Sequence, residues 1–277
     1  MREVLLIARV TLREAARRRL LWTALACAAI LLAIFAIALR LQVLQFQGRP
    51  MSPFVRYQVE SGMLMIGLYT CDLLAVVMTI LTSIDTIAGE ISSGTIHAIA
   101  TKPLARWQIV IGKLAGFAAM LAAYVALTFT GTVLVAYWTT GVLPEHAITG
   151  AALIFMECLV ALSLTLLFGT WLSTLATGVV VLGLQAVAFM GGWLEQVSGF
   201  SQAPRIITLG IWSSLVMPGE SLWRRAAYEM QTPLAGSLSF SPFANVSIPS
   251  GVAVGYAAIY LAVVVAAAVY GFEKRDF

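Results

Sequence analysis

The sequence contains few charged residues. Asp, Glu, Lys and Arg make up 11% of its 277 residues, whereas hydrophobic residues make up 60%. Soluble globular domains have roughly 25% charged and 45–50% apolar residues. A soluble fold of this length has too little interior to bury so many apolar side chains. The composition therefore excludes a soluble domain and indicates that lipid is the solvent for much of the chain.

Cysteine and histidine are scarce as well. Cys27, Cys71 and Cys158 are scattered and lie inside apolar runs, so they offer neither a disulfide framework nor a metal-binding spacing. The two histidines, His97 and His146, are far apart in the chain. No metal site and no nucleophile constellation can be assembled around them. We therefore expect no metal and no cofactor in this chain.

A phosphate-binding loop is also missing. Such a loop requires the pattern Gly-x4-Gly-Lys-Ser/Thr. At the single Gly-Lys pair, Gly112-Lys113, the position of the first glycine is occupied by Trp107 and the hydroxyl position by Leu114. We expect this chain not to be an enzyme, and any ATP hydrolysis that it depends on must take place on another polypeptide.

Six apolar segments are long enough to cross a bilayer. A helix needs about 20 residues to span roughly 30 Å of hydrocarbon. The segments are 20–39, 63–84, 114–138, 148–170, 174–194 and 251–272. The first is too long for a secretory signal, and no small-residue cleavage site follows it. The prediction is an all-α polytopic membrane protein with six transmembrane helices in one domain, residues 1–277.

Lysine and arginine are unevenly divided between the two sets of loops. If the N-terminus lies inside, the inner segments carry 11 of these residues, and the outer segments carry 6 over much longer loops. Basic loops are retained on the cytoplasmic side of a membrane. Both termini are therefore predicted to be cytoplasmic.

Residues 1–19 have an amphipathic pattern. Four arginines share one helical face and four apolar residues line another: Arg2, Arg9, Arg13 and Arg17, and Leu5, Ala8, Leu12 and Ala16. This pattern predicts a helix on the cytoplasmic leaflet, where arginine is attracted to anionic lipid. The helix either anchors the topology or is an elbow helix that also touches a cytoplasmic partner.

The connection between the second and third spans is longer than a connection needs to be. It reads DTIAGEISSGTIHAIATKPLARWQIVIGK, and its apolar positions recur every three or four residues: Ile84, Ile87, Ile91, Thr95 and Ile99. That spacing predicts an amphipathic surface helix over 85–101, which Lys102-Pro103 ends. Such a helix either fixes the topology or gives a soluble protein a surface through which it can move the two spans.

A new helix is expected to begin near Leu104 and to continue into the third span. It carries Arg106 in its first turns and Lys113 at the membrane interface. Gly112 and Gly116 form a small-xxx-small pair. Such a pair lets another helix pack closely against this one.

The region between the fifth and sixth spans, residues 196–250, has a different character. Its apolar stretch Ile206–Met217 has 12 residues and ends at Pro218-Gly219. Because that is too short to cross a bilayer, it predicts a re-entrant or interfacial helix. We interpret the whole region as a small external or re-entrant segment.

Two carboxyl side chains, Asp72 and Glu157, fall inside predicted spans. An ionised carboxylate near the middle of a span costs roughly 2.5–3.5 kcal/mol, so such residues face the protein interior. The pair either lines a polar pathway or holds a proton, or it is satisfied by neighbours such as Gln185, Tyr124 or Thr128.

Three motifs around the second connection resemble the signature of ABC-2 type permeases: Glu90-x-x-x-Gly94-Thr95, Pro103-x-x-Arg106 and Gly112-Lys113. The resemblance is greatest to the branch associated with multicopper-enzyme maturation. The N-terminal ARVTLREAARRRLL is similar to the elbow helix of that family, and Phe272–Phe277 is similar to its closing residues. The resemblance covers the whole chain.

The resemblance implies that residues 85–101 form a coupling helix, which docks into a groove on a separate ATP-binding subunit. That subunit, and not this chain, would hold ATP and Mg²⁺. Glu90 would face that subunit or the elbow helix, and Gly94 and Thr95 would lie at the turn.

The remaining positions carried over from the family lie on the two neighbouring helices. Arg106 and Lys113, after Pro103, would fix the following helix against phosphates or acidic neighbours. The elbow helix would contribute three residues: Arg13, Glu14 and Arg17.

The function implied by the resemblance is that of the permease subunit of an ATP-driven exporter in the bacterial cytoplasmic (inner) membrane. Its partners would be the ATP-binding subunit, a second permease copy or a paralogue, membrane lipid and a periplasmic protein, and no nucleic acid. Two other classes stay open. One is an ion-driven secondary transporter that uses Asp72 and Glu157, although the repeats typical of that class are not visible. The other is a non-transporting scaffold or regulator.

Overall fold

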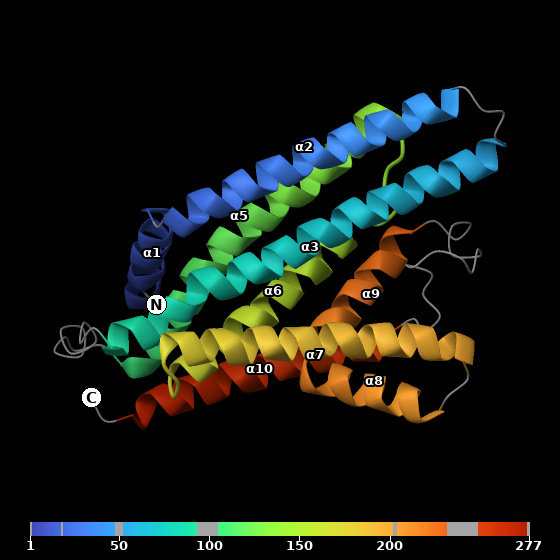
Figure 1. The fold of residues 1–277 in the computed structure, drawn as a ribbon. Helices are drawn as coiled ribbons and strands as arrows, with labels where there is room; N and C mark the ends of the chain where they lie inside the picture. The colour runs from blue at the N-terminus through green and yellow to red at the C-terminus, as the bar shows by residue number, and fades with distance from the viewer. Residues whose placement is uncertain are drawn as a thin grey trace.

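The computed structural model describes residues 2–17, 19–47, 52–92, 105–201, 204–231 and 249–275. Within these ranges the chain forms nine α-helices and no strand, which confirms the predicted all-α fold. Figure 1 shows the helices as an elongated bundle. They are α1 (Arg2–Arg17), α2 (Arg19–Gln47), α3 (Pro53–Ser92), α5 (Arg106–Thr140), α6 (Ala147–Gly169), α7 (Thr174–Ser201), α8 (Pro204–Val216), α9 (Gly219–Met230) and α10 (Gly251–Glu273).

Six of these helices are long and apolar enough to cross a membrane, namely α2, α3, α5, α6, α7 and α10. They coincide one for one with the six predicted segments, so the six spans are confirmed. The helices α2, α3 and α5 extend well past the predicted ends. The apolar run measures only the part of a helix that needs lipid, and backbone hydrogen bonding continues the helix beyond it.

The centre of the bundle is α6. Seven consecutive residues, Val160 to Leu166, are buried on every side of this helix, which contacts α3, α5, α7, α9 and α10. A helix surrounded by other helices must be apolar all round, and its sequence meets that requirement. The first span, α2, lies at the edge of the bundle (Figure 1), and only 6% of its apolar window is buried.

The helices α8 and α9 form a hairpin that does not cross the bundle. In Figure 1, α8 runs inward beside α7 and α9 runs back outward beside α6, and the two meet at about half the bundle length. The turn between them is Met217-Pro218. The predicted re-entrant or interfacial placement of this short apolar stretch stays a prediction.

Two predicted segments need correction at their boundaries. Residues 85–92 are the last two turns of α3 and do not start a separate surface helix at Asp85. The rest of the predicted coupling helix, residues 93–101, lies outside the described residues. The region 196–250 is not wholly an external cap, because α9 lies buried inside the bundle. Its apolar face, with Leu222, Ala226 and Met230, packs on α6.

Candidate functional site

The first helix, α1, lies across the start of α5. At Gly112 an added Cβ would lie 2.7 Å from the Ile7 side chain, and at Gly116 it would lie 2.7 Å from the Ala8 carbonyl oxygen. Any side chain at these two positions would therefore push α1 away. The small-xxx-small pair of α5 forms the surface on which α1 packs, and the predicted close helix packing is confirmed.

The face that α1 turns to the bundle differs from the predicted apolar face. Thr11 and Ala15 are buried against the bundle, whereas Leu5 and Leu12 are exposed. Of the predicted elbow residues, Arg13 and Glu14 are exposed on this helix. Arg17 ends the helix, and its side chain lies outside the described part of the structure. The exposed leucines leave an apolar strip of α1 open to lipid or to a partner.

Lys113 joins α5 to the end of α3. Its side chain is buried, and its Nζ donates a 2.8 Å hydrogen bond to the carbonyl oxygen of Thr86. A buried ammonium group is costly unless it has such partners. The bond therefore holds together the two helix ends that flank residues 93–104.

Arg106 joins the start of α5 to the end of α10. Its Nη1 donates hydrogen bonds of 2.9 Å and 2.8 Å to the carbonyl oxygens of Glu273 and Arg275. Both predicted cationic residues thus brace α5 through backbone carbonyl groups. Figure 1 shows α1, the start of α5 and the end of α10 together at one end of the bundle.

The other residues predicted for the coupling site are not all described. Glu90 belongs to the last turn of α3, but its side chain is outside the described part. Gly94, Thr95 and Pro103 also lie outside the described residues. The structure thus describes the frame on both sides of this segment, and the roles of these four residues stay predictions.

Asp72 on α3 and Glu157 on α6 come together in the middle of the bundle. Their exposed fractions are 4% and 1%, and the two carboxyl groups interact directly. Gln185 on α7 donates a 2.9 Å hydrogen bond from Nε2 to Glu157 Oε1. The other two predicted neighbours bond elsewhere. Tyr124 donates to the Ala24 carbonyl, and Thr128 donates to the Tyr124 carbonyl.

The tip of the α8–α9 hairpin lies against this carboxyl pair. Gly219 is the first residue of α9, and an added Cβ there would lie 2.9 Å from Glu157 Oε1. Two hydroxyl groups of α10 hold the end of α8. Tyr256 donates to the Leu215 carbonyl at 2.5 Å, and Tyr260 donates to the Val216 carbonyl at 2.8 Å. These bonds satisfy carbonyl groups that a helix end leaves without an internal partner.

The buried helix α9 adds two charged residues that the sequence interpretation did not assign to a site. Glu220 is buried beside Glu157, and burial followed by that neighbouring charge raises the pKa of Glu220 to about 8. Arg224 is 3% exposed and forms a 2.8 Å ion pair with Glu195 of α7. The i, i+4 spacing of Glu220 and Arg224 was visible in the sequence, but it is equally typical of an exposed helix.

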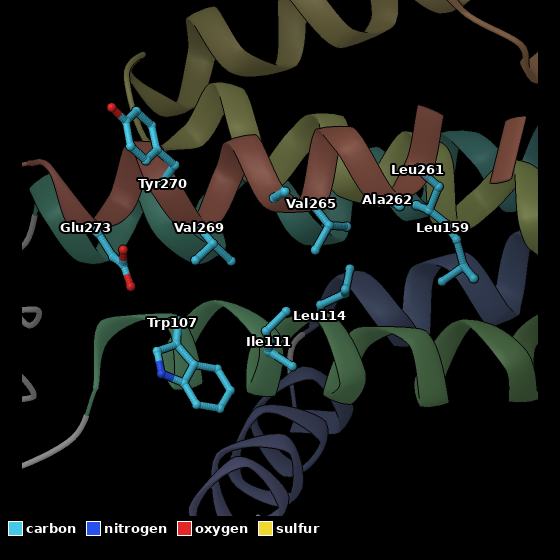
Figure 2. A pocket seen from close by; sticks show the side chains of 11 residues that line it. Trp107, Ile111, Leu114, Leu159, Leu261, Ala262, Val265, Val269, Tyr270 and Glu273 are labelled. Carbon is cyan, nitrogen blue, oxygen red and sulfur yellow. The ribbon is translucent and has the colours of Figure 1, made fainter. Parts of the chain in front are cut away.

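A groove lies on the surface between α5, α6 and α10. Its volume is about 710 Å³, and Figure 2 shows its lining: Trp107, Ile111, Leu114, Leu159, Leu261, Ala262, Val265, Ala266, Val269, Tyr270 and Glu273. Apolar side chains from both walls line most of its length, and Trp107, Tyr270 and Glu273 stand together at one end (Figure 2). Apolar walls with an amphipathic end suit a lipid-facing surface.

A family model decides which class of membrane protein this bundle belongs to. The model of the ABC-2 family transporter proteins matches residues 5–277, which include every described helix in whole or in part. The chain belongs to the ABC-2 transporter family. A comparison with curated proteins finds no match.

As an ABC-2 permease, the chain is a multi-pass membrane component of a transporter. Members of such a family are generally not catalytic themselves and work with an ABC ATP-binding partner. The ABC-2 match includes the N-terminal helix and the α8–α9 hairpin. The finer assignment to the multicopper-enzyme maturation branch stays a prediction.

Proposed function

We propose that this ABC-2 permease is the membrane-spanning subunit of an ATP-driven exporter, and that separate ATPase subunits drive it through the segment 85–101. The observation that carries this proposal is the bracing of α3 and α5 around residues 93–104, the stretch that joins the two helices. Lys113 joins α5 to Thr86 of α3, and Arg106 joins α5 to the end of α10. The ends of three spans thus move as one body.

This bracing supports a simple coupling mechanism. ATP binding closes two ATPase subunits and displaces the segment between α3 and α5. Because the two helices are tied at Lys113 and α1 is seated on Gly112 and Gly116, the displacement passes to whole helices. Packed helices respond to such a push as rigid bodies, which is how an interface opens or closes.

The exposure of α2 supports a dimer. Large apolar residues repeat along its outer face, at Ile30, Ile34, Ile37, Leu41 and Leu44. A second permease copy, or a paralogue, covers part of this face, and lipid covers the rest. The path for the exported substrate then lies between the two permeases.

In the bacterial inner membrane the excess of lysine and arginine places both termini in the cytoplasm.

Affinity purification from native membranes tests the proposal. The tagged wild-type chain is solubilised in mild detergent and compared with a Glu90→Arg, Gly94→Trp double variant. A Glu145→Arg variant is the matched control, since it reverses a charge at the opposite end of α5. Gel filtration and thermal unfolding establish that each variant is folded.

We expect an ABC ATP-binding protein to co-purify with the wild type and with the control, and to be lost from the folded double variant. A folded wild-type chain that retains no ATPase, even with nucleotide and a crosslinker present, contradicts the proposal. An ATPase that binds all three chains equally places the docking surface somewhere other than 85–101.

A further inference from the structure

The middle of the bundle contains more buried carboxyl groups than buried cations. Asp72, Glu157 and Glu220 are all at most 7% exposed and come from α3, α6 and α9. The buried cation beside them, Arg224, forms an ion pair with Glu195 through Nη2, while its Nε and Nη1 have no hydrogen-bond partner among the described residues. The interaction between Arg224 and Glu220 is weaker than the effects of burial and of Glu157 on Glu220. The cluster therefore has an excess of acidic groups in a low-dielectric place.

Three acceptor oxygens in this cluster also receive no hydrogen bond. Apart from the contact between the two carboxyl groups, no N–H or O–H group of the described residues reaches Asp72 Oδ1, Glu157 Oε2 or Gln185 Oε1. Gln185 has given one of its donors to the other oxygen of Glu157. Leaving a buried acceptor unsatisfied is costly, so three of them on three different helices favour a shared donor or cation.

The space at this point limits what that group can be. The carboxyl of Glu157 is enclosed by the Asp72 carboxyl, the Gln185 amide and the backbone of Gly219. The shortest of these approaches leaves no room for a side chain as small as a methyl group at Gly219. So close an arrangement favours a proton or a single-atom ion over a larger group.

We propose that Asp72, Glu157 and Gln185 form an intramembrane site for one small monovalent cation, either a proton or an alkali-metal ion. Two carboxylates in contact repel strongly unless a positive charge lies between them, and carboxyl and amide oxygens are suitable ligands for it. The bound charge holds α3, α6 and α7 together at the tip of the α8–α9 hairpin. When it leaves, repulsion between the two carboxylates pushes Asp72 of α3 and Glu157 of α6 apart. This site does not depend on the proposed ATPase partner.

Thermal unfolding of the purified chain in detergent tests the site. The Tm is measured in sodium chloride and in choline chloride at equal ionic strength, and over a range of pH. The variants are Asp72→Asn and Glu157→Gln, which keep the shape of each side chain. The matched control is Glu60→Gln on α3, because Glu60 is buried like Asp72 but has its own cation, Arg56, at 2.8 Å.

If the ion is sodium, the wild-type Tm rises with sodium relative to choline and saturates, as ligand binding to the folded state requires. If it is a proton, sodium has no effect and the wild-type Tm falls as the pH rises. Either response disappears or shrinks in both site variants and persists in Glu60→Gln. Tyr69, Cys158 and Glu220 also face the pair, and the pKa of Glu220 depends on the charge of Glu157. A Glu220→Gln variant is therefore measured in parallel, and the response of the Asp72–Glu157 pair must persist in it.

Infrared spectroscopy of the wild type covers the case in which a site variant does not fold. A protonated buried carboxyl has a carbonyl band that persists at neutral pH and shifts in heavy water. Because Glu220 also holds a proton at neutral pH, the band counts only if it remains in Glu220→Gln. Such a band, or a saturable sodium effect on the Tm, supports the site. The absence of both overturns the proposal, as does a response to pH and sodium that is the same in the wild type and the site variants.

Discussion

Lys113 and Thr86 lie on different helices and are joined by a 2.8 Å hydrogen bond from the Lys113 ammonium group to the Thr86 carbonyl oxygen. The bond connects the two helices that enter and leave the segment 93–104. A single buried side chain therefore ties the end of α3 to the start of α5. Replacing Lys113 is therefore the most direct test of the connection between α3 and α5.

Replacing Lys113 with methionine removes the bond but keeps most of the apolar stem. We expect the variant to lose about 1–3 kcal/mol of stability, because the Thr86 carbonyl loses a charged donor. Thermal unfolding of the purified protein measures this effect. Lys274→Met is the control, since Lys274 is exposed at the end of α10, and its replacement should change the Tm little. A Lys113→Met variant as stable as the control would show that the bond does not brace the helices.

Replacing Gly116 with leucine should displace α1. An added Cβ lies 2.7 Å from the Ala8 carbonyl, and such overpacking costs about 1–3 kcal/mol or forces the helix to move. Limited proteolysis at the arginines of α1 should become faster in the intact membrane protein. Gly183→Leu serves as the control, because an added Cβ at Gly183 meets nothing within 4 Å. Equal cleavage rates in the two variants would contradict the close seat of α1.

Glu220 should make stability depend on pH. Burial and the neighbouring Glu157 raise its pKa from 4.5 to about 8, so the folded protein holds this proton more tightly than the unfolded chain does. Its contribution is complete at pH values below 4.5 and is lost as the pH rises through about 8. The wild-type Tm should fall across this range. Glu220→Gln should fall less, and a slope identical to that of the wild type would show that Glu220 titrates normally.

The tyrosines of α10 should hold the hairpin in place. Tyr260→Phe removes the 2.8 Å bond to Val216, and we expect a loss of about 0.5–1.5 kcal/mol. Hydrogen exchange at α8 and at the start of α9 should become faster, because the tip opens more often. The exposed Tyr270, at the far end of the same helix, provides the control as Tyr270→Phe. Protection of α8 that does not change in Tyr260→Phe would argue against this role.

Much of the fold could be predicted because lipid imposes a strict rule. A segment of about 20 apolar residues has one stable arrangement in a bilayer, a helix that crosses it. The segments 148–170 and 251–272 therefore correspond to α6 and α10 within one or two residues at each end. For the same reason the shortness of Ile206–Met217 predicted a helix that does not span the bilayer, and α8 is such a short helix. Polar helix extensions have no such rule, so the continuation of α3 through residue 92 was missed.

The site was less predictable, since it depends on which faces meet. Asp72 and Glu157 could be identified as costly residues from their positions alone, and Gln185 as one of three plausible neighbours. The sequence does not show that Glu220 joins them, because a short polar helix such as α9 is as typical of an exposed surface as of an interior. The side of α1 that packs on the bundle could not be predicted for a related reason. The leucines of α1 indicated an apolar face, but the side of α1 that packs on the bundle contains Ile7, Thr11 and the small Ala15.

By itself, the sequence determined the class of the protein and the number of its spans. The length of an apolar segment is a local property, and it decides whether that segment can cross the bilayer. It also carried the motif pattern of the ABC-2 family, which the match over residues 5–277 bears out. Only the tertiary structure decided that Lys113 bonds to Thr86 and that the hairpin tip closes on a buried carboxyl pair. These contacts join residues far apart in the chain, and their energies depend on burial and on distances that no linear pattern contains.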